Sequence, residues 1–138
     1  MKMKTTINYK ADKEYEGVNA TGAKIAIDMY DPEDKKAMSP MEVLLTSVAA
    51  CAMVDVSIML RKRKKTLIDF KAEAEGTRRE EHPRAFTDIH VHFIITSPDA
   101  TEEEVAKLVD LSVDKYCSVA ATLKGGPNLT HSFEVRRE

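Results

Sequence analysis

The sequence predicts a single α+β domain with the element order β-β-β-α-β-β-α-β, in which two helices pack against antiparallel sheet. Segments with a period of two occupy residues 4–30 and 66–96, whereas two longer segments, 39–60 and 97–126, carry apolar residues at helical spacing. Runs of strands interrupted by single helices are typical of the α+β class. The chain of 138 residues suits one core but not two, so residues 1–138 are expected to form one domain.

The N-terminal segment 4–30 predicts an antiparallel meander of three strands. Ile25, Ile27 and Met29 alternate on one face of the third strand, and the sequences ADK and TGA supply the intervening turns. The segment 31–38 is polar, contains a proline and has no periodicity, so it is expected to be a loop.

The first helix is predicted to begin at Ser39 and to continue through Leu60. Ser39 suits the N-cap, Pro40 suits the first helical position, and Glu42 completes an S-x-x-E capping box. The basic sequence RKRKK, residues 61–65, then complements the negative end of the helix dipole.

This first helix is apolar on nearly every side, so it must be covered on every side. Its length suits a membrane span, but Glu42 and Asp55 lie within it and argue against a membrane. One sheet covers only one face. We therefore expect a second copy of the chain to cover the remainder, as a homodimer.

The segments 66–78 and 84–96 predict the two strands of a hairpin, and 128–135 predicts a final strand. Between them, Thr101 and Glu104 form a second capping box that opens a helix over residues 97–126. That helix is expected to carry Cys117 and to stop at a Gly-Gly pair.

Composition excludes several classes of function. The net charge of −2 gives no field to attract nucleic acid, so no nucleic-acid partner is expected. The first residues have no apolar signal segment, which favours a cytoplasmic location. Two cysteines in a reducing compartment do not indicate a structural disulfide framework, so redox chemistry becomes the sharper question.

Cys51 and Cys117 are the candidate catalytic residues, and each also has a purely structural interpretation. Cys51 lies about three turns into its helix, beyond the reach of the N-terminal dipole, among small residues that allow close helix packing. Free cysteine is among the residues most often buried and inert. Because both cysteines lie on helices that must be buried, they could approach each other closely enough for a disulfide.

The histidines offer less. His90 and His92 have an H-x-H spacing that could ligate a metal, although such alternation more often marks the polar face of a strand. No further ligands accompany them, and His82 and His131 are isolated. Neither a metal nor a cofactor is therefore predicted.

Three segments carry a resemblance to a known family: SPMEVLLTSVAACAMVDV (39–56), HPRAFTDIHVHFIIT (82–96) and YCSVAATLKGGPNLTHSFEV (116–135). They resemble the OsmC/Ohr family of osmotically inducible and organic hydroperoxide resistance proteins, and the first of them resembles its YhfA-like OsmC subgroup. The resemblance covers nearly the whole chain. It implies an intertwined homodimer with the long first helices buried centrally and sites at the subunit boundary.

The resemblance also implies a thiol peroxidase that acts in oxidative stress defence. In the family's peroxidases a cysteine at the position of Cys51 attacks an organic hydroperoxide and becomes a sulfenic acid. A second cysteine, at the position of Cys117, condenses with it to a disulfide, which a dithiol reductant reduces.

This sequence departs from those peroxidases at the pair that activates the thiolate, a glutamate ten residues before the first cysteine and an arginine from the N-terminal strands. Met41 occupies the glutamate position, with Glu42 one place away, and there is no arginine before Arg61. Another cation, such as Lys13 or Lys24, would have to act instead. The alternative function is therefore a dimer without peroxidase activity that binds a small hydrophobic or thiol ligand at the subunit interface.

Overall fold

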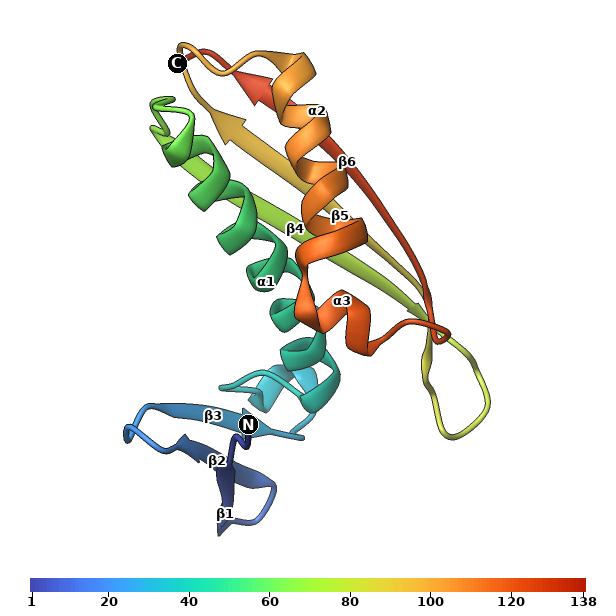
Figure 1. The fold of residues 1–138 in the computed structure, drawn as a ribbon. Coiled ribbons are helices and arrows are strands. Elements are labelled where there is room, and N and C mark those ends of the chain that lie inside the picture. Colours follow the sequence, from blue (N-terminus) through green and yellow to red (C-terminus); the bar gives the residue numbers. More distant parts are fainter. The chain divides into compact units, whose positions relative to one another are not determined.

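The computed structural model describes all residues, 1–138, and divides into two compact units, Met1–Leu44 and Leu45–Glu138. Its strands and helices follow one another in the predicted order, so the α+β class is confirmed (Figure 1). The grouping of the whole chain into one domain stays a prediction.

The first unit contains the three predicted strands, which form an antiparallel sheet in the order β1-β2-β3. Their bounds are Thr5–Ala11 for β1, Glu14–Asn19 for β2 and Lys24–Asp28 for β3. The turn before β3 needs the positive φ of 90° at Gly22, which glycine adopts without strain. The segment expected to be a plain loop contains a short 3₁₀ helix, η1, at Pro32–Asp34.

The chain after β3 is held by the buried carboxylate of Asp28. It accepts hydrogen bonds from Lys35 Nζ and from the backbone N–H groups of Lys36 and Ala37, each at 2.8 Å. Burial opposes ionisation of this carboxyl, but the hydrogen bonds outweigh burial and lower the pKa of Asp28 to about 2.

Helix α1 spans Pro40–Lys62 and starts with the predicted capping box. The backbone N–H of Ser39 donates to Glu42 Oε1 at 2.9 Å, and the backbone N–H of Glu42 donates to Ser39 Oγ at 3.3 Å. The helix is long and apolar enough to cross a membrane, a test that core helices of soluble proteins also pass. It buries one stripe at the spacing of a helix face: Val48, Ala49, Ala52, Val56 and Leu60.

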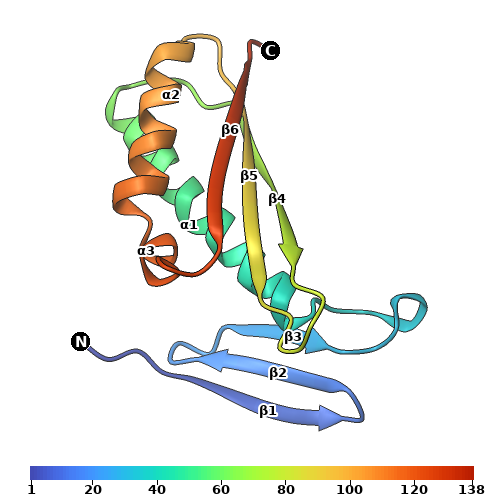
Figure 2. The ribbon, with the colours of Figure 1, turned by 90° about the vertical axis from the view of Figure 1, so that its right-hand side faces the viewer.

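The second unit contains a three-stranded sheet in the order β4-β5-β6, with both long helices on one face (Figure 2). Strands β4 (Asp69–Arg78) and β5 (Phe86–Thr96) form the predicted antiparallel hairpin. Strand β6 (Asn128–Arg136) pairs with β5 in parallel, which differs from the expected all-antiparallel sheet. The reason is the helical connection, which carries the chain back to the starting end of β5 before β6 begins.

The core of this unit lies between the sheet and the helices. The inward side chains of β5 are at most 1% exposed, and helix α2 (Glu102–Leu111) presents three similarly buried residues to them. These core residues are Ile89, Val91, Phe93, Ile95, Val105, Leu108 and Val109.

The second helical segment is not the single helix expected over 97–126. Its capping box at Thr101 and Glu104 is confirmed, but α2 gives way to a π-helical turn, η2 (Ser112–Tyr116). A short helix, α3 (Ser118–Thr122), follows. Cys117 therefore lies at the break between helices, where its extended backbone makes it the N-cap of α3.

Candidate functional site

Cys51 lies on α1 beside the stripe that faces the core, with a partly buried side chain and a free thiol. It is flanked by small residues, Ala49, Ala50 and Ala52, which leave room for a neighbouring segment to approach. Being about three turns from the helix start, it gains no activation from the helix N-terminus.

Cys117 is almost fully buried, at 2% exposure, and its thiol is also free. Its Sγ accepts a hydrogen bond from the backbone N–H of Ala120 at 3.4 Å and lies 4.0 Å from the carbonyl oxygen of Val48 on α1. The contact with Val48 brings this thiol to the same turn of α1 that carries Cys51.

The two thiols interact directly. Burial, with a smaller contribution from the neighbouring Cys51 thiol, raises the pKa of the Cys117 thiol to about 11, although the hydrogen bond from Ala120 N–H opposes this rise. The structure thus brings together the two residues that the sequence selected from distant helical segments. Their catalytic roles stay predictions.

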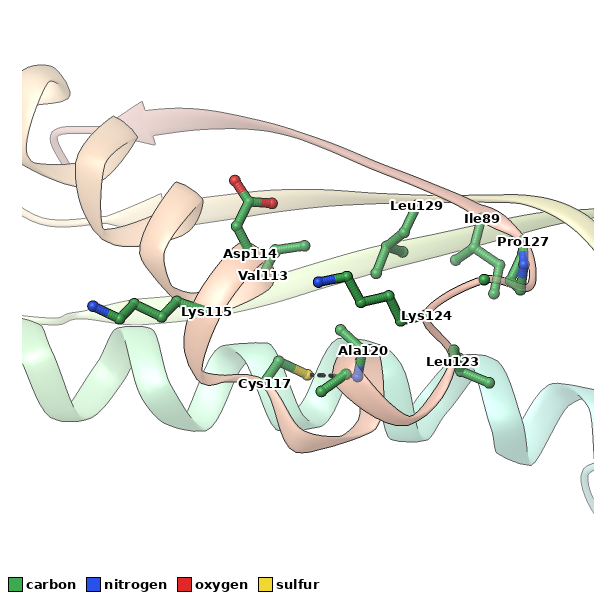
Figure 3. Close-up of a pocket in the computed structure, with 12 residues that line it drawn as sticks. Ile89, Val113, Asp114, Lys115, Cys117, Ala120, Leu123, Lys124, Pro127 and Leu129 are labelled. Atoms are coloured by element: carbon green, nitrogen blue, oxygen red, sulfur yellow. Dashed lines mark hydrogen bonds between the residues drawn. The ribbon is translucent and has the colours of Figure 1, made fainter.

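Cys117 also lines an open cavity of about 500 Å³ between the helices and the sheet (Figure 3). Ile89, Leu123 and Leu129 give the cavity an apolar wall. Apolar walls of this kind are found in sites that hold small organic molecules.

The cavity contains charged residues that the sequence analysis missed. Lys124 extends across it toward Val113 and Asp114, whereas Lys115 points away (Figure 3). Lys124 supplies a cation at the cavity that holds Cys117. The sequence marks Lys124 only by its position just before the Gly125-Gly126 pair. A lysine at the end of a helix ordinarily interacts with the last backbone carbonyl groups, so this position does not indicate a site.

A sequence model of the family described as OsmC-like protein matches residues 32–132. The chain belongs to the OsmC-like protein family. Protein YhfA of Escherichia coli K12 is 39% identical over 133 residues, 96% of this chain and 98% of that protein. A hydroperoxide reductase of Mycoplasma genitalium is 26% identical over 115 residues, 81% of this chain and 80% of the reductase.

The OsmC-like fold is also found among solved structures. The crystal structure of an OsmC-like protein from Mycoplasma pneumoniae superimposes on this chain with a TM-score of 0.81. The alignment covers 98% of this chain and 96% of the other, at 22% identity, and is therefore a likeness of fold.

The two carboxylates on α1 of this OsmC-like chain, those of Glu42 and Asp55, differ in their hydrogen bonding. Glu42 is hydrogen-bonded to Ser39 in the capping box, and these bonds hold the pKa of Glu42 below its usual range. Asp55 lies one turn after Cys51, and its Oδ2 is buried with no hydrogen-bond partner in the chain. Burial raises the pKa of Asp55. This carboxyl needs a hydrogen-bonding partner that the single chain does not supply.

One group of side chains could hold a metal ion. Asp110, Asp114 and His131 each bring one ligand atom within 4.8 Å of the others. His131 Nε2 lies 3.3 Å from Asp110 Oδ1, so a protonated imidazole forms an ion pair there. Both carboxylates are exposed, and exposed acidic groups commonly gather without a metal, so we do not assign a metal site to this group.

His90 and His92 belong to a hydrogen-bonded ladder on β5 and β6, which favours the polar-face interpretation over metal ligation. The two ring nitrogens of His90 contact Thr130 Oγ1 at 2.7 Å and Ser132 Oγ at 2.8 Å. Those of His92 contact Ser132 Oγ at 2.7 Å and Glu134 Oε1 at 3.1 Å.

The ladder has one consistent direction, set by Glu134. Hydrogen bonds from His92 and Arg136 hold the pKa of Glu134 below its usual range, so its carboxylate is ionised and only accepts. His92 must then donate from Nε2 and accept at Nδ1 from the Ser132 hydroxyl. That hydroxyl has no second proton, so it accepts from His90 Nε2.

We predict that both uncharged imidazoles carry their proton on Nε2. Long-range proton–nitrogen NMR spectra in mildly alkaline solution check this prediction directly. In Ser132→Ala, His90 should lose its fixed tautomer whereas His92 should keep its own, because only His92 retains the carboxylate partner. A proton on Nδ1 of either ring in the wild type would contradict the direction of the ladder.

Proposed function

We propose that this OsmC-like protein reduces organic hydroperoxides, with Cys51 as the attacking thiol and Cys117 as the resolving thiol. The observation that carries the proposal is the position of the Cys117 sulfur, 4.0 Å from the carbonyl oxygen of Val48 on the turn of α1 that carries Cys51. The apolar-walled cavity that Cys117 lines and the related hydroperoxide reductase support it.

The chemistry uses two steps on sulfur. The Cys51 thiolate attacks one peroxide oxygen, so an S–O bond forms while the O–O bond breaks, and the leaving alkoxide takes a proton to become an alcohol. Cys117 then attacks the sulfenic sulfur, forming an S–S bond and releasing water. A dithiol reductant returns both cysteines to thiols. That cycle suits a cytoplasmic protein, which is the location we propose.

The same proposal includes a homodimer, because α1 keeps an uncovered apolar side. Val54 is 55% exposed and Ile58 39% exposed, and Tyr116 near them is 50% exposed. A second cavity, of about 440 Å³, lies on this side beside Asp55 and Lys62. A partner that covers this side with apolar groups would remove the exposed apolar surface from water.

A second candidate function is binding of a small hydrophobic or thiol ligand without turnover. Met41 at the family's glutamate position and the absence of an arginine before Arg61 favour it, because an unactivated thiol reacts slowly. The binding site would lie at the subunit interface, on the side of α1 that carries the cavity beside Asp55 and Ile58.

Oxidation of the fully reduced protein by one equivalent of cumene hydroperoxide separates the two functions. The peroxidase predicts rapid loss of both thiols, a mass loss of two hydrogens and release of cumyl alcohol. Thiols that survive the hydroperoxide would overturn the peroxidase and favour the ligand-binding function. Hydrogen peroxide serves as the control oxidant, since it lacks the organic group that the cavity would hold.

A further inference from the structure

Ser112 is a fully buried serine, at 0% exposure, that is hydrogen-bonded to the backbone near both cysteines. Its hydroxyl donates to the carbonyl oxygen of Ala52, the residue after Cys51, at 2.8 Å. Its own carbonyl oxygen accepts from the backbone N–H of Cys117 at 2.7 Å. One residue therefore ties the backbone beside the first cysteine to the backbone of the second.

Because both bonds involve the π-helical turn η2, they fix the position of this turn relative to α1. The bond from Cys117 N–H closes a turn five residues long, wider than an α-helical turn, and such insertions frequently occur at functional sites. The chain then leaves the helix at Cys117 with φ −71° and ψ 109°. Because Val48 and Ala52 are one turn apart on α1, the contacts from Cys117 and Ser112 hold η2 against the turn that contains Cys51.

We propose that Ser112 is a positioning residue that holds the Cys117 thiol against Cys51 so that the disulfide forms within one chain. The inference rests on the proposed function for the step in which hydroperoxide oxidises Cys51. It concerns the next step, in which the Cys117 sulfur supplies two electrons, the S–S bond forms, and the S–O bond of the sulfenic acid breaks to release water.

That second step depends on position because the thiolate of Cys117 is scarce. With a pKa of about 11, roughly one molecule in ten thousand carries this thiolate at pH 7. A high effective concentration of the thiol at the sulfenic sulfur offsets that deficit. Loosening η2 from α1 lowers the effective concentration and leaves the first step, at Cys51, unchanged.

The test compares Ser112→Ala with Ser57→Ala, whose hydroxyl also donates to a helix carbonyl, that of Val54. With cumene hydroperoxide, Ser112→Ala should form the sulfenic acid within about twofold of the wild-type rate and form the disulfide about tenfold more slowly. Dimedone should therefore trap more sulfenic acid in this variant. Ser57→Ala should change neither step.

A second measurement needs no peroxidase activity. Equilibration with reduced and oxidised glutathione gives the effective concentration of one thiol at the other, which should fall about tenfold in Ser112→Ala and stay unchanged in Ser57→Ala. An unchanged value in folded Ser112→Ala would overturn the inference, as would a wild type that forms no intrachain disulfide. If glutathione gives the expected result while hydroperoxide leaves the thiols intact, the proposed function fails and the role of Ser112 stands.

Discussion

Replacing Cys51 with serine should abolish hydroperoxide consumption, a fall of about a hundredfold or more, because a serine hydroxyl in this position has no thiolate to attack the peroxide. Replacing Cys117 with serine should leave the first turnover intact and stop at a sulfenic acid on Cys51. Mass spectrometry after dimedone treatment checks both outcomes, with one dimedone adduct expected in Cys117→Ser and none in Cys51→Ser.

The two variants control for each other, since each removes one thiol from the same contact and both should keep the fold seen by circular dichroism. Peroxide consumption by Cys51→Ser at the wild-type rate would exclude Cys51 as the nucleophile. Equal loss of the first step in both variants would show that the pair acts as one structural unit, contrary to the assigned order of events.

The disulfide step should also depend on pH with a definite sign. Because burial raises the pKa of Cys117 to about 11, its thiolate fraction grows about tenfold per pH unit from neutrality upward. The rate of disulfide formation should rise with pH across that range. Stopped-flow measurement of sulfenic acid decay would contradict the assignment if the decay were independent of pH.

The elements that the sequence predicted well are those fixed by local bonds. Both capping boxes, Ser39 with Glu42 and Thr101 with Glu104, link residues three apart, so their pattern is visible in a short segment. The β4–β5 hairpin likewise joins neighbouring segments of alternating residues.

The missed features depend on contacts between distant residues. The bond from Ser112 to Ala52 spans sixty residues, and no local pattern distinguishes this serine from any other helical serine. The parallel pairing of β6 with β5 likewise follows from the path of the intervening helices. For the site, the sequence named Cys51 and Cys117, but only the fold shows their contact and brings Lys124 to the cavity.

Replacing Ile58 with aspartate should convert the proposed homodimer into a monomer. Ile58 lies on the uncovered side of α1 and lines the cavity that contains Asp55. The partner would bury a second carboxylate there beside Asp55, and Lys62, which lines the same cavity, cannot offset both negative charges. Burying this excess charge costs about 3 kcal/mol or more and weakens association at least about a hundredfold. Sedimentation equilibrium measures the change as a halving of the mass.

The matched control is Ile68→Asp, because Ile68 is also exposed, at 58%, but lies beyond the end of α1 in the connection to β4. A general effect of added negative charge would dissociate both variants, whereas an interface on α1 predicts dissociation of Ile58→Asp alone. A monomeric wild type would contradict the dimer outright. Because one apolar side of α1 lies uncovered in one chain, a soluble monomer would have to hydrate it, and the dimer covers it with one surface.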